Sequence, residues 1–234
     1  YVRDQVGVLV ARTKEFATAY AAGDTATAKS LYATARVPWE RVEPVAESFG
    51  DLDPKLDARE GDTEPGTPWT GWHRIEKDLW APGGAPLGAA ARQELADALV
   101  ADTLDLQTRV AATELKPAQL GNGAKELLDE VATGKVTGEE ERYSHTDLWD
   151  FQANVDGARV AYEALRPALK ENDAELDTTL ASRFSALQTL LDQYRQGDGF
   201  VLYTALTPAQ VKELATAVDA LGEPLAGLTA AVVR

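Results

Sequence analysis

One segment in the second half of the sequence places apolar residues at regular steps of three and four. Its members are Leu148, Phe151, Val155, Ala158, Tyr162, Leu165 and Leu169. Because an α-helix turns once every 3.6 residues, these side chains line one face of a helix. A continuous apolar face must be buried against other structure. The segment therefore predicts a core-facing helix.

The same spacing recurs through most of the chain. It is found in four further segments, residues 2–20, 95–110, 180–194 and 214–232. Helix boundaries are marked as well, since Gly23 and Asp24 are suited to end one helix and cap the next. Thr207 is suited to cap the last helix, and no segment shows convincing period-two alternation. We therefore expect an all-α protein of antiparallel helices, arranged in one or two four-helix bundles.

Loops rich in glycine, proline and acidic residues interrupt the helical pattern. They separate a first half, residues 1–115, from a second half, residues 116–234. A chain of 234 residues is long enough to bury a substantial core. We expect each half to form one helical bundle.

The composition limits the chemistry that the chain can support. Its formal net charge is −15, which disfavours nucleic acid and anionic lipid as partners and attracts cations. Cysteine and methionine are absent, which excludes thiolate zinc sites and thiol catalysis and fits an extracytoplasmic location. No apolar run approaches the roughly 18 residues that span a bilayer. Because the sequence begins with Tyr1, we expect a signal peptide, a lipid-anchor segment or a further domain to precede it.

His73 and Glu76 lie three residues apart in the segment Gly71–Trp80. On a helix this spacing puts both side chains on one face, where an imidazole and a carboxylate can bind one metal ion. The alternative is a half-buried histidine beside a glutamate that pairs with Arg74 or Lys77. Since the chain lacks thiols, a metal site must use Asp, Glu and its two histidines, which favours iron, manganese, calcium or weakly held zinc.

Other acidic residues are candidates for the same kind of site. Glu40 and Glu43 share a helical face if they lie on one helix; the alternative is a pair of solvated carboxylates that interact with Arg36 or Arg41. Asp57 lies in a segment of mixed charge.

A run of three glutamates, residues 139–141, precedes a helix that we expect to begin near Ser144. Acidic residues there are favoured by the helix dipole, which is a sufficient structural reason for at least one of them. His145 lies shortly after the run and is either a metal ligand or a surface residue. The sequence contains no His-Glu-x-x-His, Gly-x-Ser-x-Gly or phosphate-loop motif.

Three motifs together resemble the EfeO/EfeM family of imelysin-like proteins. They are Gly-Trp-His-Arg-Ile-Glu at 71–76, the segment 40–46 followed by Phe-Gly-Asp-Leu-Asp at 49–53, and the long segment 138–154. The resemblance covers nearly the whole chain, and the third motif is the most specific. It implies a single module, an all-helical fold of two packed four-helix bundles, and metal bound in a cleft between them.

The resemblance also implies a function. Family members capture ferric or ferrous iron outside the cytoplasm for an Efe-type iron permease, and a peroxidase is a further component of the system. We therefore expect a monomer that binds iron without catalysing a reaction. We expect it in the periplasm or at the cell surface, where a lipid anchor on a preceding segment could hold it. Zinc or another divalent ion is expected to substitute for iron. The candidate metal ligands, carried over by position, are His73, Glu76, Glu40, Glu43, Asp57 and a glutamate of the run 139–141. Glu140 is favoured within the run, and Glu139 is a further candidate. These residues form either one site or two.

Two other functions are compatible with these residues. An imelysin-type metallopeptidase would need an open coordination position and a general base near a metal-bound water. The second function is binding of an acidic polysaccharide through bridging Ca²⁺ ions, and a chelator would abolish such binding. Members of the family often carry an N-terminal cupredoxin domain, so the sequence corresponds either to the shorter EfeM-like form or to a fragment.

Overall fold

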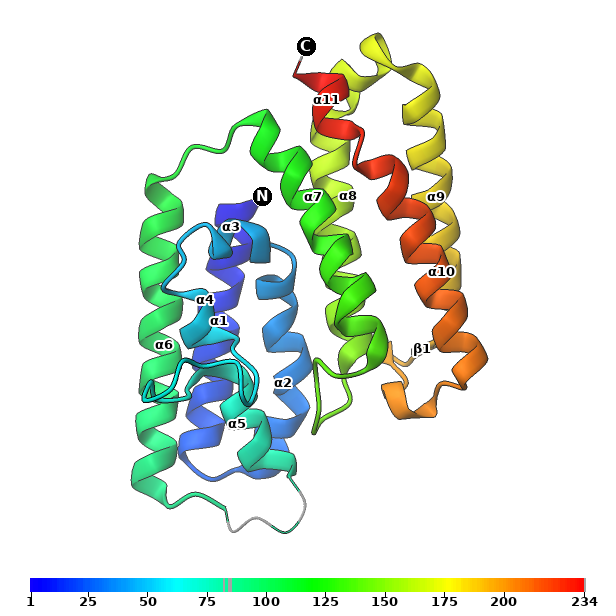
Figure 1. The fold of residues 1–234 in the computed structure, drawn as a ribbon. Coiled ribbons are helices and arrows are strands. Elements are labelled where there is room, and N and C mark those ends of the chain that lie inside the picture. The colour runs from blue at the N-terminus through cyan, green and yellow to red at the C-terminus, as the bar shows by residue number, and fades with distance from the viewer. Residues whose placement is uncertain (82, 84–85, 234) are drawn as a thin grey trace. The chain divides into compact units, whose positions relative to one another are not determined.

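The structure is a computed structural model, and it describes residues 1–81, 83 and 86–233. The regular secondary structure of the described residues is almost entirely helical, and these residues form two compact units (Figure 1). Unit 1 comprises Tyr1–Thr113 and Glu141–Ser144, and unit 2 comprises Glu114–Glu140 and His145–Arg234. The short segment Glu141–Ser144 therefore packs with residues that precede it by a long stretch of sequence.

The described residues of unit 1 form three long helices and three short ones. The long helices are α1 (Val2–Ala21), α2 (Thr25–Glu40) and α6 (Ala89–Ala112), and the short ones are α3 (Glu43–Glu47), α4 (Asp53–Leu56) and α5 (Gly71–Trp80). Helix α1 packs against both α2 and α6, and α5 lies against α2, α4 and α6. Asp24 caps α2 by accepting a hydrogen bond from the backbone N–H of Thr27, as its sequence position predicts.

Aromatic side chains fill the core of unit 1 beside α5. The ring of Trp72 lies 5.1 Å from that of Phe16 and 6.0 Å from that of Tyr32, measured between centroids. All three side chains are buried. Because His73 follows Trp72 directly, this packing fixes the part of α5 that carries the histidine.

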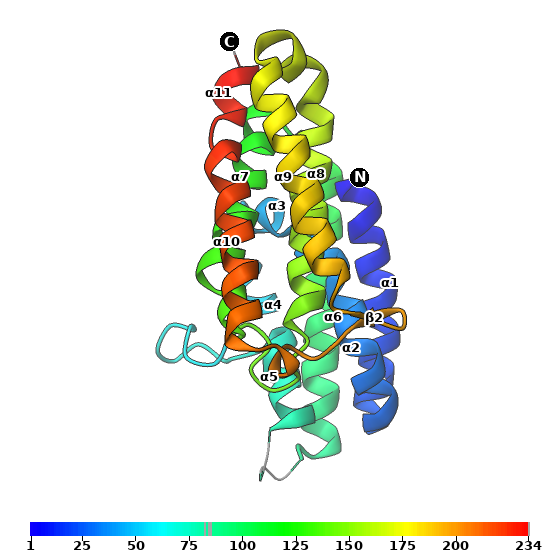
Figure 2. The ribbon, with the colours of Figure 1, turned by 90° about the vertical axis from the view of Figure 1, so that its right-hand side faces the viewer.

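Unit 2 is built around four long helices that run alongside one another (Figure 2). They are α7 (Pro117–Thr133), α8 (Asp147–Asn172), α9 (Ala174–Asp192) and α10 (Pro208–Leu225). Helix α7 packs against α8 and α10, and α9 packs against the same two helices. The remaining elements are α11 (Leu228–Val232), the 3₁₀ helices η1 (Lys135–Thr137) and η2 (Tyr203–Ala205), and a hairpin of β1 (Arg195–Gln196) and β2 (Gly199–Phe200).

The apolar stripe of the sequence forms the core-facing side of α8. Its seven residues, from Leu148 to Leu169, are each no more than 6% exposed, so this prediction is confirmed. Thr207 caps α10 and Pro208 occupies its first turn, as predicted. The start of α8 differs from the expectation, because this helix begins at Asp147 and not near Ser144. His145 has a φ of 59°, a left-handed conformation that interrupts any helix before this point.

The all-α class is confirmed. The arrangement as two four-helix bundles, the division into halves 1–115 and 116–234, and a metal cleft between them remain predictions. Within the described part of the chain, no helix combines the length and the apolar character needed to cross a bilayer.

Candidate metal centre

Helix α5 brings His73 and Glu76 together, as the spacing of three residues predicts. His73 Nδ1 lies 3.3 Å from Glu76 Oε2. The two side chains are 2% and 0% exposed. The alternative interpretation expected a half-buried histidine, whereas both His73 and Glu76 are fully buried.

Gly71 allows α5 to begin close to α4. Its φ is +83°, and a Cβ atom at this position would lie 2.2 Å from the carbonyl oxygen of Leu56 and 2.5 Å from that of Lys55. Only glycine combines this backbone conformation with so close an approach. The position of His73, two residues later, consequently depends on Gly71.

The segment Glu141–Ser144 covers Glu76 from the other side. Glu76 Oε1 accepts hydrogen bonds from the backbone N–H of Tyr143, at 2.8 Å, and of Ser144, at 2.7 Å. Burial alone would raise the pKa of Glu76, but His73 and these two N–H donors outweigh it and hold that pKa below its usual range. Glu76 is therefore a buried anion.

Glu141 is placed beside this pair by the same segment. Ser144 Oγ donates a hydrogen bond of 2.9 Å to Glu141 Oε2, and Tyr32 Oη lies 3.4 Å from Glu141 Oε1. Glu141 is fully buried. His73, Glu76 and Glu141 each offer one ligand atom, and these three atoms lie within 4.8 Å of one another.

The separation of these atoms is close to what a metal ion requires. Bonds of about 2.1 Å from nitrogen or oxygen to a metal leave two ligand atoms at most about 4.2 Å apart. The pair His73 Nδ1 and Glu76 Oε2, at 3.3 Å, is already within this limit. One imidazole with two carboxylates suits iron or zinc better than copper(I), which prefers sulfur ligands.

A buried arginine lies among the carboxylates next to this group. Arg36 Nη2 lies 2.5 Å from Glu40 Oε1, and Arg36 Nε lies 2.6 Å from Glu141 Oε1. Arg36 Nη1 donates to Asp57 Oδ1, whose other oxygen accepts a hydrogen bond of 2.8 Å from Trp39 Nε1. Burial alone would raise the pKa of Asp57, but Arg36 and His73 outweigh it and hold that pKa well below its usual range.

Exposed polar side chains lie outside the buried group and tie its segments together. Glu60 pairs with Lys77, accepts a hydrogen bond of 2.5 Å from Tyr143 Oη, and accepts another of 3.1 Å at its carbonyl oxygen from Arg142. Lys77 follows Glu76 on α5, and Arg142 follows Glu141. The loop after α4, helix α5 and the segment Glu141–Ser144 are thus joined at the surface as well as inside.

The structure groups some of the predicted ligands. Glu40, Asp57, His73 and Glu76 come together in unit 1 around Arg36 and Glu141. Glu43 is buried at the start of α3, beyond the end of α2, so it does not share a helix with Glu40.

The glutamate run is divided between the two units. Glu139 is exposed and Glu140 is buried, and both belong to unit 2 with His145. Their assignment as ligands remains a prediction, as does that of Glu43. Glu141 was not the glutamate favoured within the run, because its only signal in the sequence is membership of the run 139–141.

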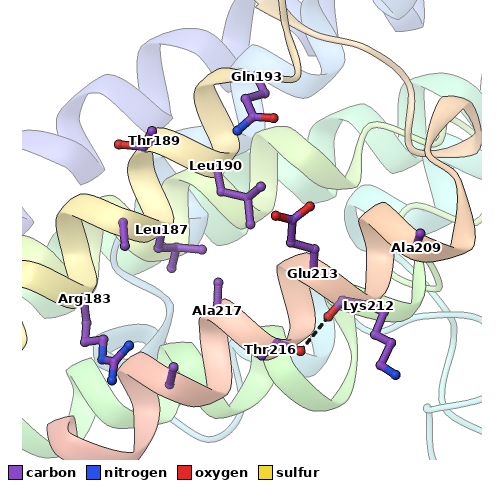
Figure 3. A pocket seen from close by; sticks show the side chains of 12 residues that line it. Arg183, Leu187, Thr189, Leu190, Gln193, Ala209, Lys212, Glu213, Thr216 and Ala217 are labelled. Carbon is purple, nitrogen blue, oxygen red and sulfur yellow. Dashed lines mark hydrogen bonds between the residues drawn. The ribbon is translucent and has the colours of Figure 1, made fainter.

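Unit 2 carries a separate groove of about 670 Å³ between α9 and α10 (Figure 3). Its floor includes Leu187, Leu190 and Ala217, and Figure 3 shows Glu213 beside Leu190. The groove contains no histidine and a single carboxylate, so it lacks the ligands of a metal site.

Comparison with known proteins identifies the family of this chain. A family model described as imelysin matches residues 1–228. An Efem/EfeO family lipoprotein of Staphylococcus haemolyticus is 42% identical over 228 residues, which are 96% of this chain and 78% of that protein. The iron uptake system component EfeO of Yersinia pseudotuberculosis is 44% identical over 231 residues, and that of Escherichia coli O157:H7 is 43% identical.

The fold defines a helical protein that carries a buried group of one imidazole and several carboxylates. The chain belongs to the imelysin family, and within it to the Efem/EfeO family. It spans 61% of the Yersinia relative and 60% of the Escherichia relative.

Proposed function

We propose that this protein binds iron outside the cytoplasm and delivers it to an Efe-type iron permease, without catalysing a reaction. The observation that supports this most strongly is the buried group of His73, Glu76 and Glu141, which has the ligand types and spacing for one metal ion. The names of its relatives, iron uptake system component and family lipoprotein, agree with the proposal.

The charge of the group favours a cation. Four buried carboxylates, those of Glu40, Asp57, Glu76 and Glu141, are close to one guanidinium and one imidazole. Counting each carboxylate as −1, the guanidinium as +1 and the imidazole as neutral gives this set a formal charge of −3, and burying such a charge is unfavourable. Fe³⁺ or Fe²⁺ would neutralise it, and oxygen ligands suit both ions.

Burial favours binding over peptide hydrolysis. A metallopeptidase requires an open coordination position that a peptide can reach and a general base beside it. His73, Glu76 and Glu141 are at most 2% exposed. Both oxygens of Glu76 already have partners, Oε1 in two backbone N–H groups and Oε2 in His73, which suits a positioned ligand better than a base.

The partners proposed are the permease and the peroxidase of the same uptake system, and the location proposed is the periplasm or the cell surface.

Metal titration of the purified chain tests the binding step. We expect Fe³⁺, or Zn²⁺ as a redox-inert substitute, to bind and to raise the melting temperature, because a ligand that binds only the folded state stabilises it.

The two histidines provide a matched pair of variants. His73→Asn should remove most of this binding, whereas His145→Asn should retain it, and asparagine tolerates the left-handed backbone at residue 145. Equal binding by both variants would refute the assignment of His73. Metal-dependent cleavage of a peptide library that is abolished by Glu76→Gln would favour the peptidase instead.

A further inference from the structure

Arg36 occupies the position that a cation would take among three of the carboxylates. Its three guanidinium nitrogens face Glu40, Asp57 and Glu141 one by one, and the side chain is fully buried. The carboxylates come from the end of α2, from the residue after α4 and from the segment Glu141–Ser144. Arginine stays charged in proteins, and its rigid fork can bind several carboxylates at once.

Two of these carboxylates also face the histidine side of the site. Asp57 Oδ1, which accepts from Arg36, lies 3.4 Å from His73 Nε2. Glu141, whose Oε1 lies beside Arg36 Nε, belongs to the group that can hold a metal. A metal ion bound by His73, Glu76 and Glu141 would therefore share Glu141 with a fixed positive charge, and Asp57 would link that charge to the far side of the His73 ring.

We propose that Arg36 is an internal counter-cation that competes with the bound metal and thereby sets the affinity of the site. This inference rests on the proposed function, because it assigns a role to Arg36 only if a metal binds to His73, Glu76 and Glu141. Without metal, Arg36 compensates the carboxylates and holds their three segments together. With metal, its charge opposes that of the ion and weakens the hold of Glu141, the carboxylate that contacts both.

The proposal predicts a combination of effects that a purely structural role does not. In Arg36→Met the carboxylates lose their compensation, so the metal-free protein should melt at a lower temperature. The same variant should bind Zn²⁺ at least tenfold more tightly, and its metal-induced rise in melting temperature should exceed that of the parent. A residue that only held the segments in place would, when removed, weaken both stability and binding.

Arg36→Lys separates charge from geometry. Lysine retains the positive charge, but a single ammonium group cannot bridge three carboxylates in the way that the guanidinium fork does. We expect this variant to melt at a lower temperature than the parent while its Kd for Zn²⁺ stays within about threefold of the parental value. Arg109→Met is the matched control, because Arg109 also pairs with two carboxylates, Asp51 and Asp105, but is partly exposed.

The experiment is calorimetric titration of the 234-residue chain with Zn²⁺ at neutral pH, together with thermal melting with and without the metal. Tighter binding by Arg36→Met than by the parent and by Arg109→Met supports the proposal. If Arg36→Met is unfolded without metal, Zn²⁺ in the refolding buffer should restore its helical circular dichroism, and failure to do so overturns the proposal.

The same titration separates this inference from the proposed function. Weaker binding by a folded Arg36→Met, when the parent binds Zn²⁺, overturns the role of Arg36 and leaves the metal site intact. Absence of binding by the parent overturns the proposed function itself.

Discussion

Removal of the Glu76 carboxylate should release the segment Glu141–Ser144. In Glu76→Ala the backbone N–H groups of Tyr143 and Ser144 lose their shared acceptor, at present 2.8 and 2.7 Å away. Hydrogen bonds to a charged group contribute about 1.5–3 kcal/mol each, so the loss is about 3–6 kcal/mol. Glu76 is fully buried, and solvent screening does not reduce this value substantially.

Amide hydrogen exchange measures this effect at the two residues concerned. If these amides exchange through local opening, a loss of 3 kcal/mol raises their rates by about 100-fold, since each 1.4 kcal/mol corresponds to a factor of ten. Glu94→Ala, which removes an exposed glutamate from α6 in the same unit, is the matched control and should leave both rates unchanged. Equally slow exchange in Glu76→Ala and in the parent would refute the view that Glu76 anchors this segment.

Three further predictions concern the fold, pH and metal. Gly71→Ala should lower the melting temperature by several degrees, because the new Cβ would lie 2.2 Å from the Leu56 carbonyl oxygen; an unchanged melting curve would contradict this. Burial alone would raise the pKa of Asp177, but Arg166 and Tyr162 outweigh it and hold that pKa below its ordinary 3.8. The ionised Asp177 therefore stabilises unit 2 above pH 3.8, and this stabilisation is lost as the pH falls through the pKa of the folded state. Asp177→Asn should therefore cost about 1–2 kcal/mol in urea unfolding at pH 7 and progressively less as the pH falls below 3.8, whereas a cost that does not change with pH would argue against the pairing. Chelation with EDTA should reverse the stabilisation by Zn²⁺ completely, and a shift that survives chelation would indicate non-specific binding.

Local regularities made the helices predictable. The stripe from Leu148 to Leu169 and the caps at Asp24 and Thr207 each depend on residues within a few positions, and the structure confirms them. The pairing of His73 with Glu76 was predictable for the same reason, since three residues on a helix fix their common face.

The rest of the site depends on contacts that sequence spacing does not reveal. Arg36 and Asp57 are 21 residues apart, and Tyr32 and Glu141 are 109 apart. The return of Glu141–Ser144 to unit 1 is followed by a left-handed backbone at His145, a conformation that non-glycine residues seldom adopt. Helical periodicity therefore does not show which glutamate of the run 139–141 lies beside His73 and Glu76, and the prediction favoured Glu140 over Glu141.

Anomalous scattering at the iron edge, from crystals of the chain soaked with iron, tests the metal site most directly. A single strong peak about 2.2 Å from ligand atoms of His73, Glu76 and Glu141 is the predicted result. A peak on other residues, with Glu76 still bonded to the Tyr143 and Ser144 amides and His73 without metal, would contradict the proposed site.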